Sequence, residues 1–340
     1  MKEVAQHAGV SIATVSYTLH TPDRVSDATR QRVEASIKEL GFVVNSAART
    51  MRTGEGPGMG IVIGELSHSF SVGVVRGAQA GAREVGTTML IANADKDDAE
   101  QSRYVELFDQ ARMQGIILAP LDDNPADIDR LRDHGTPVVL VNLHTNRHDH
   151  CSVLMDNEEV GFRAAEHLIS LGCRKLVFAT GYPRAQPLAD RKRGIDRALK
   201  NHPEVTLDVY ARQQIDAEDG RAIAGRILAG TRERRPDGII AATEMMALGL
   251  IEELLIGGIK VPEDIKLIST EENRNAFDAP VRISRLQEPA FDMGWHAAQL
   301  LAEEVHLGDK HKHQILMLHA TLFAGESTLG RGARTVEEVL

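Results

Sequence analysis

Side chains near the start of an expected second helix could contact double-stranded DNA, some at the bases and some at the phosphates. We expect them on its outer face or in its first turn, and they are Ser11, Ile12, Ala13, Thr14, Ser16 and Tyr17. Ile12 and Ala13 cannot donate hydrogen bonds to base edges, but they can contact the methyl groups of thymine. Tyr17 can stack or donate one hydrogen bond, and the hydroxyls of Thr14 and Ser16 suit contacts with phosphate. The pattern therefore indicates a surface that binds DNA.

A helix-turn-helix would hold these side chains outward. The small core expected beneath them consists of Val4, Ala5, Ala8, Val15 and Leu19. Gly9 can adopt the positive φ that a tight turn needs, at little cost. Ser11 follows where its hydroxyl can accept a backbone N–H of the second helix. Such a motif presents its base-reading side chains near the start of that helix. An ordinary helical hairpin is the alternative that spacing alone leaves open.

A third helix and a short basic segment follow. Ser26 can cap the helix, and Gly41 can end it. The apolar residues on its expected core face repeat at i, i+4 and i+7 and are Val33, Ile37 and Leu40. Residues 45–52 are rich in alanine and contain two cations and no acid. So short a segment is not stable as a helix on its own in water.

Three segments of this region carry a resemblance: EVAQHAGVSIATVSYTL, RVSDATRQRVEASIKELGF and NSAARTMRTG. In this order they are similar to the DNA-binding headpiece and hinge helix of the lactose-repressor (LacI/GalR) family of bacterial transcription regulators. The resemblance implies that the hinge residues contacting DNA are Asn45, Ala48, Arg49, Met51 and Arg52. Met51 stands where the family usually has a leucine that wedges into the minor groove, and methionine can do the same. The implied boundaries are 1–44 for the headpiece, 45–58 for the hinge helix and linker, and 59–340 for the core.

After residue 58, apolar runs alternate with amphipathic helices. The expected strands are 60–63, 88–92, 115–119, 138–141, 175–180, 238–242 and 266–269. The expected helices between them are 71–85, 99–113, 157–171, 190–200, 217–228 and 245–256. Continuous Val/Ile runs separated by helices are typical of parallel sheets covered on both faces. The pattern predicts an α/β core of two doubly wound lobes, one before Asp156 and one after it, with a ligand at the carboxyl ends of the strands.

The core segments MGIVIGELSHSF, VLMDNEEVGFRAAEHLISLGCRKLVF and RPDGIIAATEMMALGL are also similar to this family. The resemblance implies a two-lobed core of periplasmic-binding-protein type that dimerises and binds a small effector. The implied effector-binding residues are Phe70, Ser71, Arg191, Ile215, Thr243 and Glu271. Arg191 offers a planar fork of donors, and Glu271 stands where an aspartate often accepts from ligand hydroxyls. Ile215 replaces a stacking aromatic, and Thr243 with Glu244 replaces an Asn-Asp pair, which weighs against a simple hexose.

Charge limits how the chain can bind DNA. The whole chain has a formal net charge of −10, which argues against sequence-blind binding to nucleic acid. Residues 1–58 contain seven cations and six anions, a net charge of +1, so one headpiece alone would bind weakly. A dimer would raise the effective concentration of the second headpiece. We therefore expect a homodimer on a near-palindromic DNA operator, with a tetramer left open.

The sequence favours a cytoplasmic location. No apolar run is long enough for a transmembrane helix, and the N-terminal residues lack the apolar centre of a signal peptide. The two cysteines, Cys151 and Cys173, suit a reducing compartment. We expect no partner in a membrane.

Two groups of possible metal ligands lie in expected loops. The first group is His144, His148, His150 and Cys151, and the second is His306, His311 and His313. Zinc requires convergent ligands in a fixed geometry, and the spacing within each group is irregular. The sequence therefore predicts no metal and no cofactor.

These observations together predict a transcription regulator, most simply a repressor, whose core senses a small sugar-like or other polar metabolite. Two alternatives belong to other classes of protein. A solute-binding protein of the transport type would share the two-lobed core, but it would have no headpiece. An enzyme with a doubly wound core would need a catalytic constellation, and no nucleophile motif such as G-x-S-x-G occurs.

Overall fold

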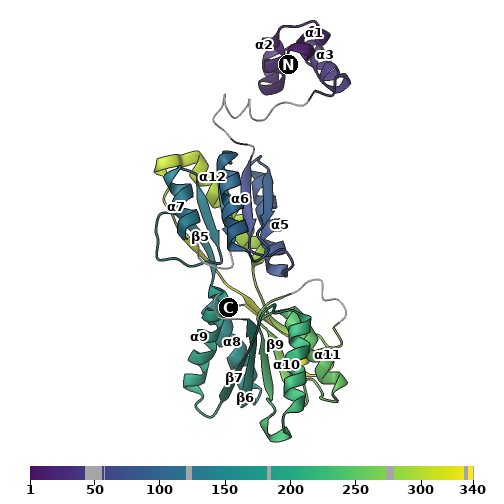
Figure 1. Cartoon of the computed structure of the whole chain (residues 1–340), viewed down its shortest axis with the longest axis vertical. Coiled ribbons are helices and arrows are strands. Elements are labelled where there is room, and N and C mark those ends of the chain that lie inside the picture. The colour runs from purple at the N-terminus through teal and green to yellow at the C-terminus, as the bar shows by residue number, and fades with distance from the viewer. Residues whose placement is uncertain are drawn as a thin grey trace. The chain divides into compact units, whose positions relative to one another are not determined.

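The computed structural model describes residues 1–42, 56, 58–119, 125–181, 185–272 and 279–332, together with the backbone of 336–339. The chain forms two compact units, Met1–Gly56 and Pro57–Leu340 (Figure 1). No helix in these ranges is both long and apolar enough to span a lipid bilayer. The expected hinge helix falls at residues outside the described ranges.

The first unit has the predicted helix-turn-helix at its start. Its described helices are α1 (Lys2–Ala8), α2 (Ile12–His20), the 3-10 turn η1 (Pro22–Arg24) and α3 (Asp27–Glu39). Gly9 ends α1 with a φ of 64°, a conformation that glycine adopts without strain. The Ser11 hydroxyl accepts a hydrogen bond of 3.0 Å from the Thr14 backbone N–H and so caps α2. The buried core beneath the helices consists of Val4, Ala5, Ala8, Val15 and Val33.

The ends of α3 differ from the sequence prediction in two ways. The Ser26 hydroxyl donates to Thr29 Oγ1 at 3.0 Å instead of accepting a backbone N–H. Leu40, expected in the core, is 43% exposed because the helix ends at this residue. The Phe42 N–H then bonds to the Ile37 carbonyl at 3.0 Å, and Phe42 packs against the core in place of Leu40.

One lobe of the second unit, the N-lobe, is built on a six-stranded parallel sheet in the order β11-β5-β4-β3-β1-β2. Its strands are β1 (Met59–Ile63), β2 (Met89–Asn93), β3 (Gly115–Ala119), β4 (Val138–Val141), β5 (Cys151–Met155) and β11 (Ile315–Leu318). On one face lie α5 (Ser69–Glu84) and α12 (Ala290–Leu307), and on the other lie α6 (Asp98–Gln110) and α7 (Pro125–Asp133) (Figure 1). The central strands are buried on both sides, as their Val/Ile runs predict.

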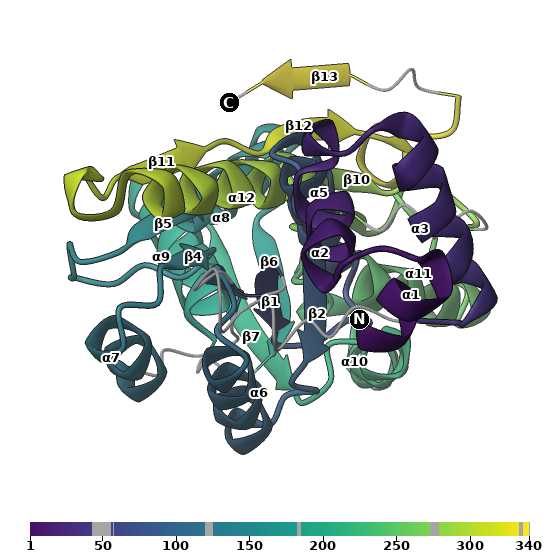
Figure 2. The ribbon, with the colours of Figure 1, turned by 90° about the horizontal axis from the view of Figure 1, so that it is seen from above.

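The other lobe, the C-lobe, has a seven-stranded sheet in the order β13-β12-β10-β9-β8-β6-β7. Its strands are β6 (Lys175–Gly181), β7 (Thr206–Arg212), β8 (Gly238–Ala241), β9 (Lys266–Ser269), β10 (Ser284–Gln287), β12 (Thr321–Ala324) and β13 (Val336–Val339). Its helices are α8 (Asn157–Ser170) and α9 (Gln186–Asn201) on one face, and α10 (Ala217–Ala229) and α11 (Glu244–Ile256) on the other. β12 runs antiparallel to β10 and β13, and Figure 2 shows β13 as the outermost strand.

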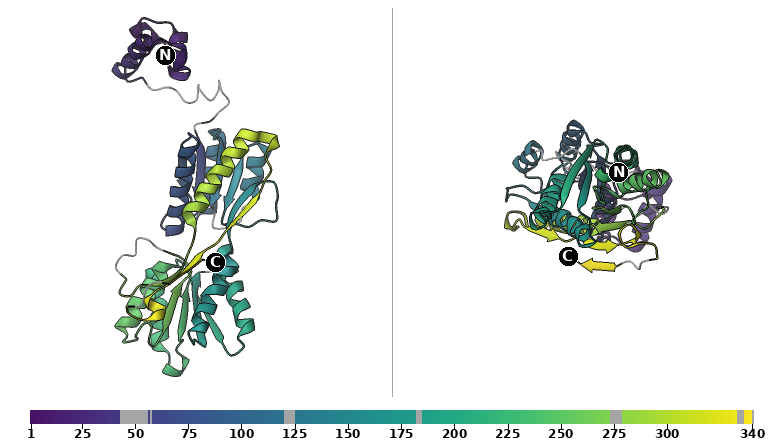
Figure 3. Two further views of the ribbon diagram at one scale, coloured as in Figure 1. Left: turned by 180° about the vertical axis from the view of Figure 1, so that it is seen from behind. Right: turned by 90° about the horizontal axis from the view of Figure 1, so that it is seen from below.

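The predicted two-lobed, doubly wound α/β core is confirmed, but the lobes are not two successive blocks of sequence. In the described part, the chain passes between them after β5, after β10, and between β11 and β12 (Figure 3). The division at Asp156 marks the first passage, since α8 begins one residue later. The sequence prediction missed that α12 and β11 return to the N-lobe, because such pairing depends on contacts far apart in the chain.

Glycines let three pairs of helices approach closely. The pairs are α5 with α12 through Gly77 and Gly294, α8 with α9 through Gly161 and Gly194, and α10 with α11 through Gly220 and Gly249. A Cβ atom on any of these glycines would lie 1.8–2.2 Å from a backbone oxygen of the facing helix. Since that oxygen cannot move away alone, any larger side chain would push the helices apart.

Gly220→Ala should destabilise the core, whereas Gly225→Ala in the same helix should stabilise it. A Cβ atom at Gly220 would lie 2.2 Å from the Met246 carbonyl oxygen, but one at Gly225 would meet nothing within 4 Å. We expect overpacking at Gly220 to cost about 1–3 kcal/mol, and helix propensity to add about 0.5–1 kcal/mol at Gly225. Urea unfolding of both variants measures the difference, and equal midpoints would contradict the glycine contact.

Candidate functional site

The headpiece exposes the side chains that the sequence assigns to DNA contact. Ile12 is 49% exposed and Tyr17 is 44% exposed, while Val15 on the opposite face of α2 is fully buried. The Arg24 guanidinium carbon lies 6.0 Å from the centre of the Tyr17 ring, which adds a cation beside this face. Of the other predicted contacts, the exposed ones are Ser11 and Ala13, and the half-buried ones are Thr14 and Ser16. The predicted hinge contacts Asn45, Ala48, Arg49, Met51 and Arg52 lie outside the described residues.

All six residues that the sequence assigns to the effector line one cavity of about 120 Å³ between the two lobes. The N-lobe contributes Phe70 and Ser71 from the first turn of α5. The C-lobe contributes Arg191, Ile215, Thr243 and Glu271. Apart from Arg191 on α9, these residues follow β7, β8 and β9, so the cavity lies at the carboxyl ends of parallel strands, as the sequence predicts.

The guanidinium of Arg191 is already held by the protein. Its Nε donates to Asn157 Oδ1 at 3.1 Å, and its Nη1 donates to the Ala242 carbonyl at 3.2 Å and to Thr270 Oγ1 at 3.1 Å. Its Nη2 forms an ion pair with Glu288 Oε1 at 2.5 Å. These contacts use four of the five N–H groups of the side chain, so at most one remains for a ligand. The partners in this network were not found from the sequence, because they lie 34 to 97 residues away.

Burial raises the pKa of Glu271 well above its ordinary value, and the nearby Glu288 carboxylate raises it further. The positive charge of Arg191 acts in the opposite direction. Glu288 has the direct ion pair with Arg191, whereas no hydrogen bond joins Glu271 to that guanidinium among the described residues. Burial raises the pKa of Glu288 as well, but the ion pair with Arg191 acts against that rise. Of the two carboxyl groups, Glu271 is therefore the one whose surroundings favour the neutral form, in which it would offer the cavity an O–H donor.

The loop after β7 holds Ile215 in a strained conformation at the edge of the cavity. Its φ is 53°, which a β-branched residue rarely adopts. Asp219 Oδ2 accepts the Ile215 N–H at 3.1 Å, and the Thr243 hydroxyl donates to the Ile215 carbonyl at 2.5 Å. The same hydroxyl accepts the Met246 N–H at 3.1 Å and caps α11. Thr243 thus positions Ile215, and strain of this kind tends to occur at ligand-binding sites.

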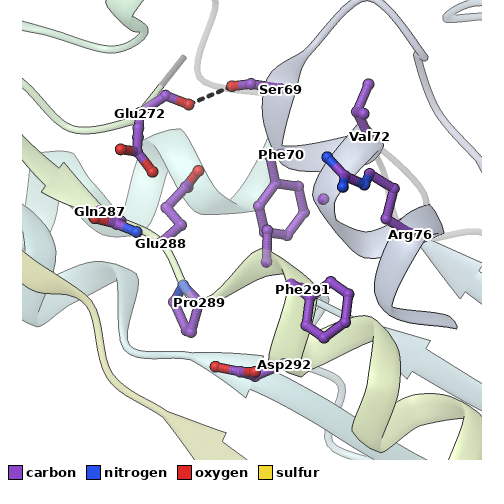
Figure 4. Close-up of a pocket in the computed structure, with 12 residues that line it drawn as sticks. Ser69, Phe70, Val72, Arg76, Glu272, Gln287, Glu288, Pro289, Phe291 and Asp292 are labelled. Atoms are coloured by element: carbon purple, nitrogen blue, oxygen red, sulfur yellow. Dashed lines mark hydrogen bonds between the residues drawn. The ribbon is translucent and has the colours of Figure 1, made fainter. Parts of the chain in front are cut away.

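A second cavity of about 380 Å³ adjoins the first and shares Phe70 and Glu288 with it. In Figure 4, the Phe70 ring and the Glu288 side chain lie close together, and Arg76 and Phe291 line the side away from Glu288. The Ser69 hydroxyl donates to the Glu272 carbonyl and so ties the start of α5 to the C-lobe (Figure 4). Glu288 therefore lies between the two cavities.

Polar contacts also join the two lobes around the first cavity. Lys96 Nζ donates to Gln214 Oε1 at 2.8 Å. The His144 N–H donates to Gln186 Oε1 at 2.7 Å, and Gln186 Nε2 donates back to the His144 carbonyl at 2.8 Å. These contacts are specific to the observed arrangement of the lobes, and a rotation of one lobe against the other would break them.

Comparisons with known proteins agree with both units. Residues 1–45 match the family model described as "Bacterial regulatory proteins, lacI family", and residues 165–328 match the one described as "Periplasmic binding protein-like domain". The chain is 28% identical over 302 residues to the ribose operon repressor of Lactococcus lactis subsp. lactis, covering 88% of this chain and 89% of the relative. It is 26% identical over 330 residues to the HTH-type transcriptional repressor PurR of Erwinia tasmaniensis, covering 96% of each chain.

A solved structure, the complex of the transcriptional regulator CelR with cellobiose, is similar over 96% of this chain and 98% of that chain, with a TM-score of 0.71 and 25% identity. The helix-turn-helix unit, the two-lobed core and these similarities agree with one another. The chain therefore belongs to the lacI family of bacterial transcription regulators, which bind DNA and are not enzymes.

Proposed function

We propose that this protein represses transcription as a homodimer on a near-palindromic operator, and that a small neutral metabolite with several hydroxyl groups controls it. The observation that carries the proposal is the cavity between the lobes, around which all six predicted effector residues meet. The proposal retains the regulator predicted from the sequence. A transport protein or a doubly wound enzyme would leave the DNA-binding headpiece without a purpose.

The chemistry of the cavity favours a neutral ligand. Arg191 and Glu288 neutralise each other, and the surroundings of Glu271 favour its neutral form, so these three residues suit a ligand without a net charge. The hydroxyl of Ser71 and the O–H of Glu271 suit ligand hydroxyls, and Phe70 and Ile215 suit its apolar faces. A volume of about 120 Å³ is below the ~300–1,000 Å³ of most ligand pockets, which favours a monosaccharide-sized effector.

The names of two relatives also favour a sugar as the effector. One is the ribose operon repressor, and the other was solved in complex with cellobiose. A pentose matches the small cavity better than a disaccharide does. D-Ribose is therefore the first probe for an effector screen, followed by other pentoses, hexoses and nucleobases.

We infer that the effector and DNA are coupled through the arrangement of the lobes. A ligand between the lobes stabilises whichever arrangement it contacts more, and it can shift the equilibrium only by that difference in affinity. The coupling is reciprocal, so operator DNA must change effector affinity by the same factor. One headpiece has a net charge of only +1 up to residue 58, so we propose that two headpieces in a dimer bind the cytoplasmic chromosome together.

Tyr17→Ala should relax the sequence preference of the repressor. Loss of the ring and hydroxyl should cost about 1–3 kcal/mol at one base pair in each half-site. Selection of duplexes from a random pool by the parent and the variant, followed by titration of the selected duplexes, measures the change. The matched control is Leu40→Ala, which removes another exposed side chain of the headpiece. An unchanged preference for the Tyr17 variant would show that this face does not read bases.

Ser71→Ala and Arg191→Ala should both impair the effector response, but only the second should destabilise the core. Loss of the Ser71 hydroxyl should weaken effector affinity about tenfold. Arg191→Ala should abolish the response and lower the free energy of unfolding by about 3–5 kcal/mol, because Glu288 would stay buried without its cation. Release of a labelled operator duplex during titration with effector measures the first effect, and urea unfolding measures the second.

The control for Ser71 is Ser170→Ala, because Ser170 lies at the exposed end of α8. Its effector titration should match that of the parent. Equal midpoints for Ser71→Ala and the parent would place Ser71 outside the effector site.

The stability of the core should depend on pH through Glu271. Its pKa is raised in the folded protein, so its stabilising contribution is complete below the ordinary pKa of glutamic acid and is lost as the pH rises through the raised value. Glu271→Gln keeps a donor but cannot ionise. Between about pH 5 and pH 9, its free energy of unfolding should therefore fall less than that of the parent. Urea unfolding at several pH values measures this difference, and parallel profiles would contradict a raised pKa.

A further inference from the structure

We propose that Cys151, Glu304, His311 and His313 form a four-ligand site for Zn²⁺ or a similar transition-metal cation in the N-lobe. One ligand atom of each side chain lies within 4.8 Å of those of the other three. The site is separate from the cavity between the lobes, and none of its four residues lines that cavity.

The fold brings Cys151 of the first predicted group together with His311 and His313 of the second, and it adds Glu304. Cys151 is the first residue of β5, and Glu304 lies in the last turn of α12. His311 and His313 lie in the segment that follows the 3-10 turn η3 (Gly308–Lys310) and leads into β11. Because β11 pairs in parallel with β5, this segment runs beside Cys151. The irregular spacing that argued against a metal thus applies to each group alone and not to the assembled cluster.

The distances between the ligand atoms suit a tetrahedral metal. Cys151 Sγ lies 3.1 Å from His311 Nε2 and 4.0 Å from His313 Nδ1. His313 Nδ1 lies 4.0 Å from Glu304 Oε2. Metal bonds of ~2.0–2.3 Å would place neighbouring ligand atoms about 3.3–3.6 Å apart, so small side-chain shifts would complete the coordination.

One buried atom supports a cation at this position. Glu304 Oε2 makes no hydrogen bond with the described residues, and a cation held by the four ligand atoms would give it a partner. The His311 side chain, whose Nε2 faces Cys151, is only 1% exposed. A hydrogen bond between Cys151 and His311 explains that pair, but it does not explain why Glu304 and His313 converge on the same point. If Nε2 of His311 binds the metal, its Nδ1 faces Glu303 Oε1 at 3.7 Å, which is too long for a hydrogen bond. A small shift of this carboxylate would let it accept the Nδ1–H and orient the metal-bound histidine.

The ligand types indicate the class of metal and its role. One thiolate, two imidazoles and one carboxylate suit Zn²⁺ and exclude Mg²⁺ and Ca²⁺, which prefer oxygen ligands alone. Four protein ligands leave no open position, so the site is structural rather than catalytic. A bound metal would hold the end of α12 and the start of β11 against β5. The passage from β10 of the C-lobe leads into α12, and the passage to β12 of the C-lobe follows β11.

Metal titration of the full chain tests the proposal. Protein stripped with a chelator should bind one equivalent of Zn²⁺ per chain, in competition with a chromophoric chelator, and should melt at a higher temperature with Zn²⁺ than without it. Co²⁺ in place of Zn²⁺ should give the visible absorption of a tetrahedral site and a thiolate charge-transfer band. Cys151→Ser and His313→Asn should each weaken Zn²⁺ binding by more than about 100-fold, beyond the 10–100-fold typical of losing an outer partner.

Matched controls are Cys173→Ser and His306→Asn, which remove the other cysteine and a nearby exposed histidine. Both should bind Zn²⁺ as the parent does. His313 is itself an exposed residue, so His313→Asn keeps the test valid if Cys151→Ser does not fold. The proposal is overturned if the parent binds less than half an equivalent of Zn²⁺, or if His313→Asn binds it with the parent's affinity.

Discussion

A buried ion pair between Arg191 and Glu288 ties the cavity between the lobes to the passages of the chain from one lobe to the other. The side chains are 5% and 4% exposed, and such a pair is tolerated only when its other hydrogen-bonding groups are satisfied. Asn157, Ala242 and Thr270 provide these partners. Glu288 precedes α12 and Asn157 begins α8, so one guanidinium joins the strand ends of the C-lobe to two of the passages. Any change in the angle between the lobes must therefore act on this network.

The same network depends on how closely the helices pack. A Cβ atom on Gly161 would lie 1.9 Å from the Arg191 carbonyl oxygen, and one on Gly194 would lie 1.8 Å from that of Glu158. The close contact of α8 with α9 is what brings the Arg191 side chain within reach of Asn157. The packing of these helices and the position of the Arg191 guanidinium at the cavity thus rest on one constraint, and a larger residue at either glycine would displace both.

Ligand control requires two arrangements of the lobes that differ by only a few kcal/mol. Among the described residues, polar contacts across the cleft join Lys96 with Gln214 and His144 with Gln186. Exposed polar contacts of this kind contribute little individually. The strained backbone of Ile215 adds a local cost that a ligand could offset by packing against its side chain.

The sequence by itself determined the elements whose signals are local. Short-range spacing was enough to predict the helix-turn-helix, its Gly9 turn and Ser11 cap, and the Val/Ile strands of the sheets. Family resemblance located six residues that meet at one cavity. Only the tertiary structure decided which partners hold Arg191, that α12 and β11 return to the N-lobe, and that Cys151 meets His311. These features pair groups separated by 34 residues, for Arg191 with Asn157, to 160 residues, for Cys151 with His311. No local periodicity encodes which distant strands and helices pack together.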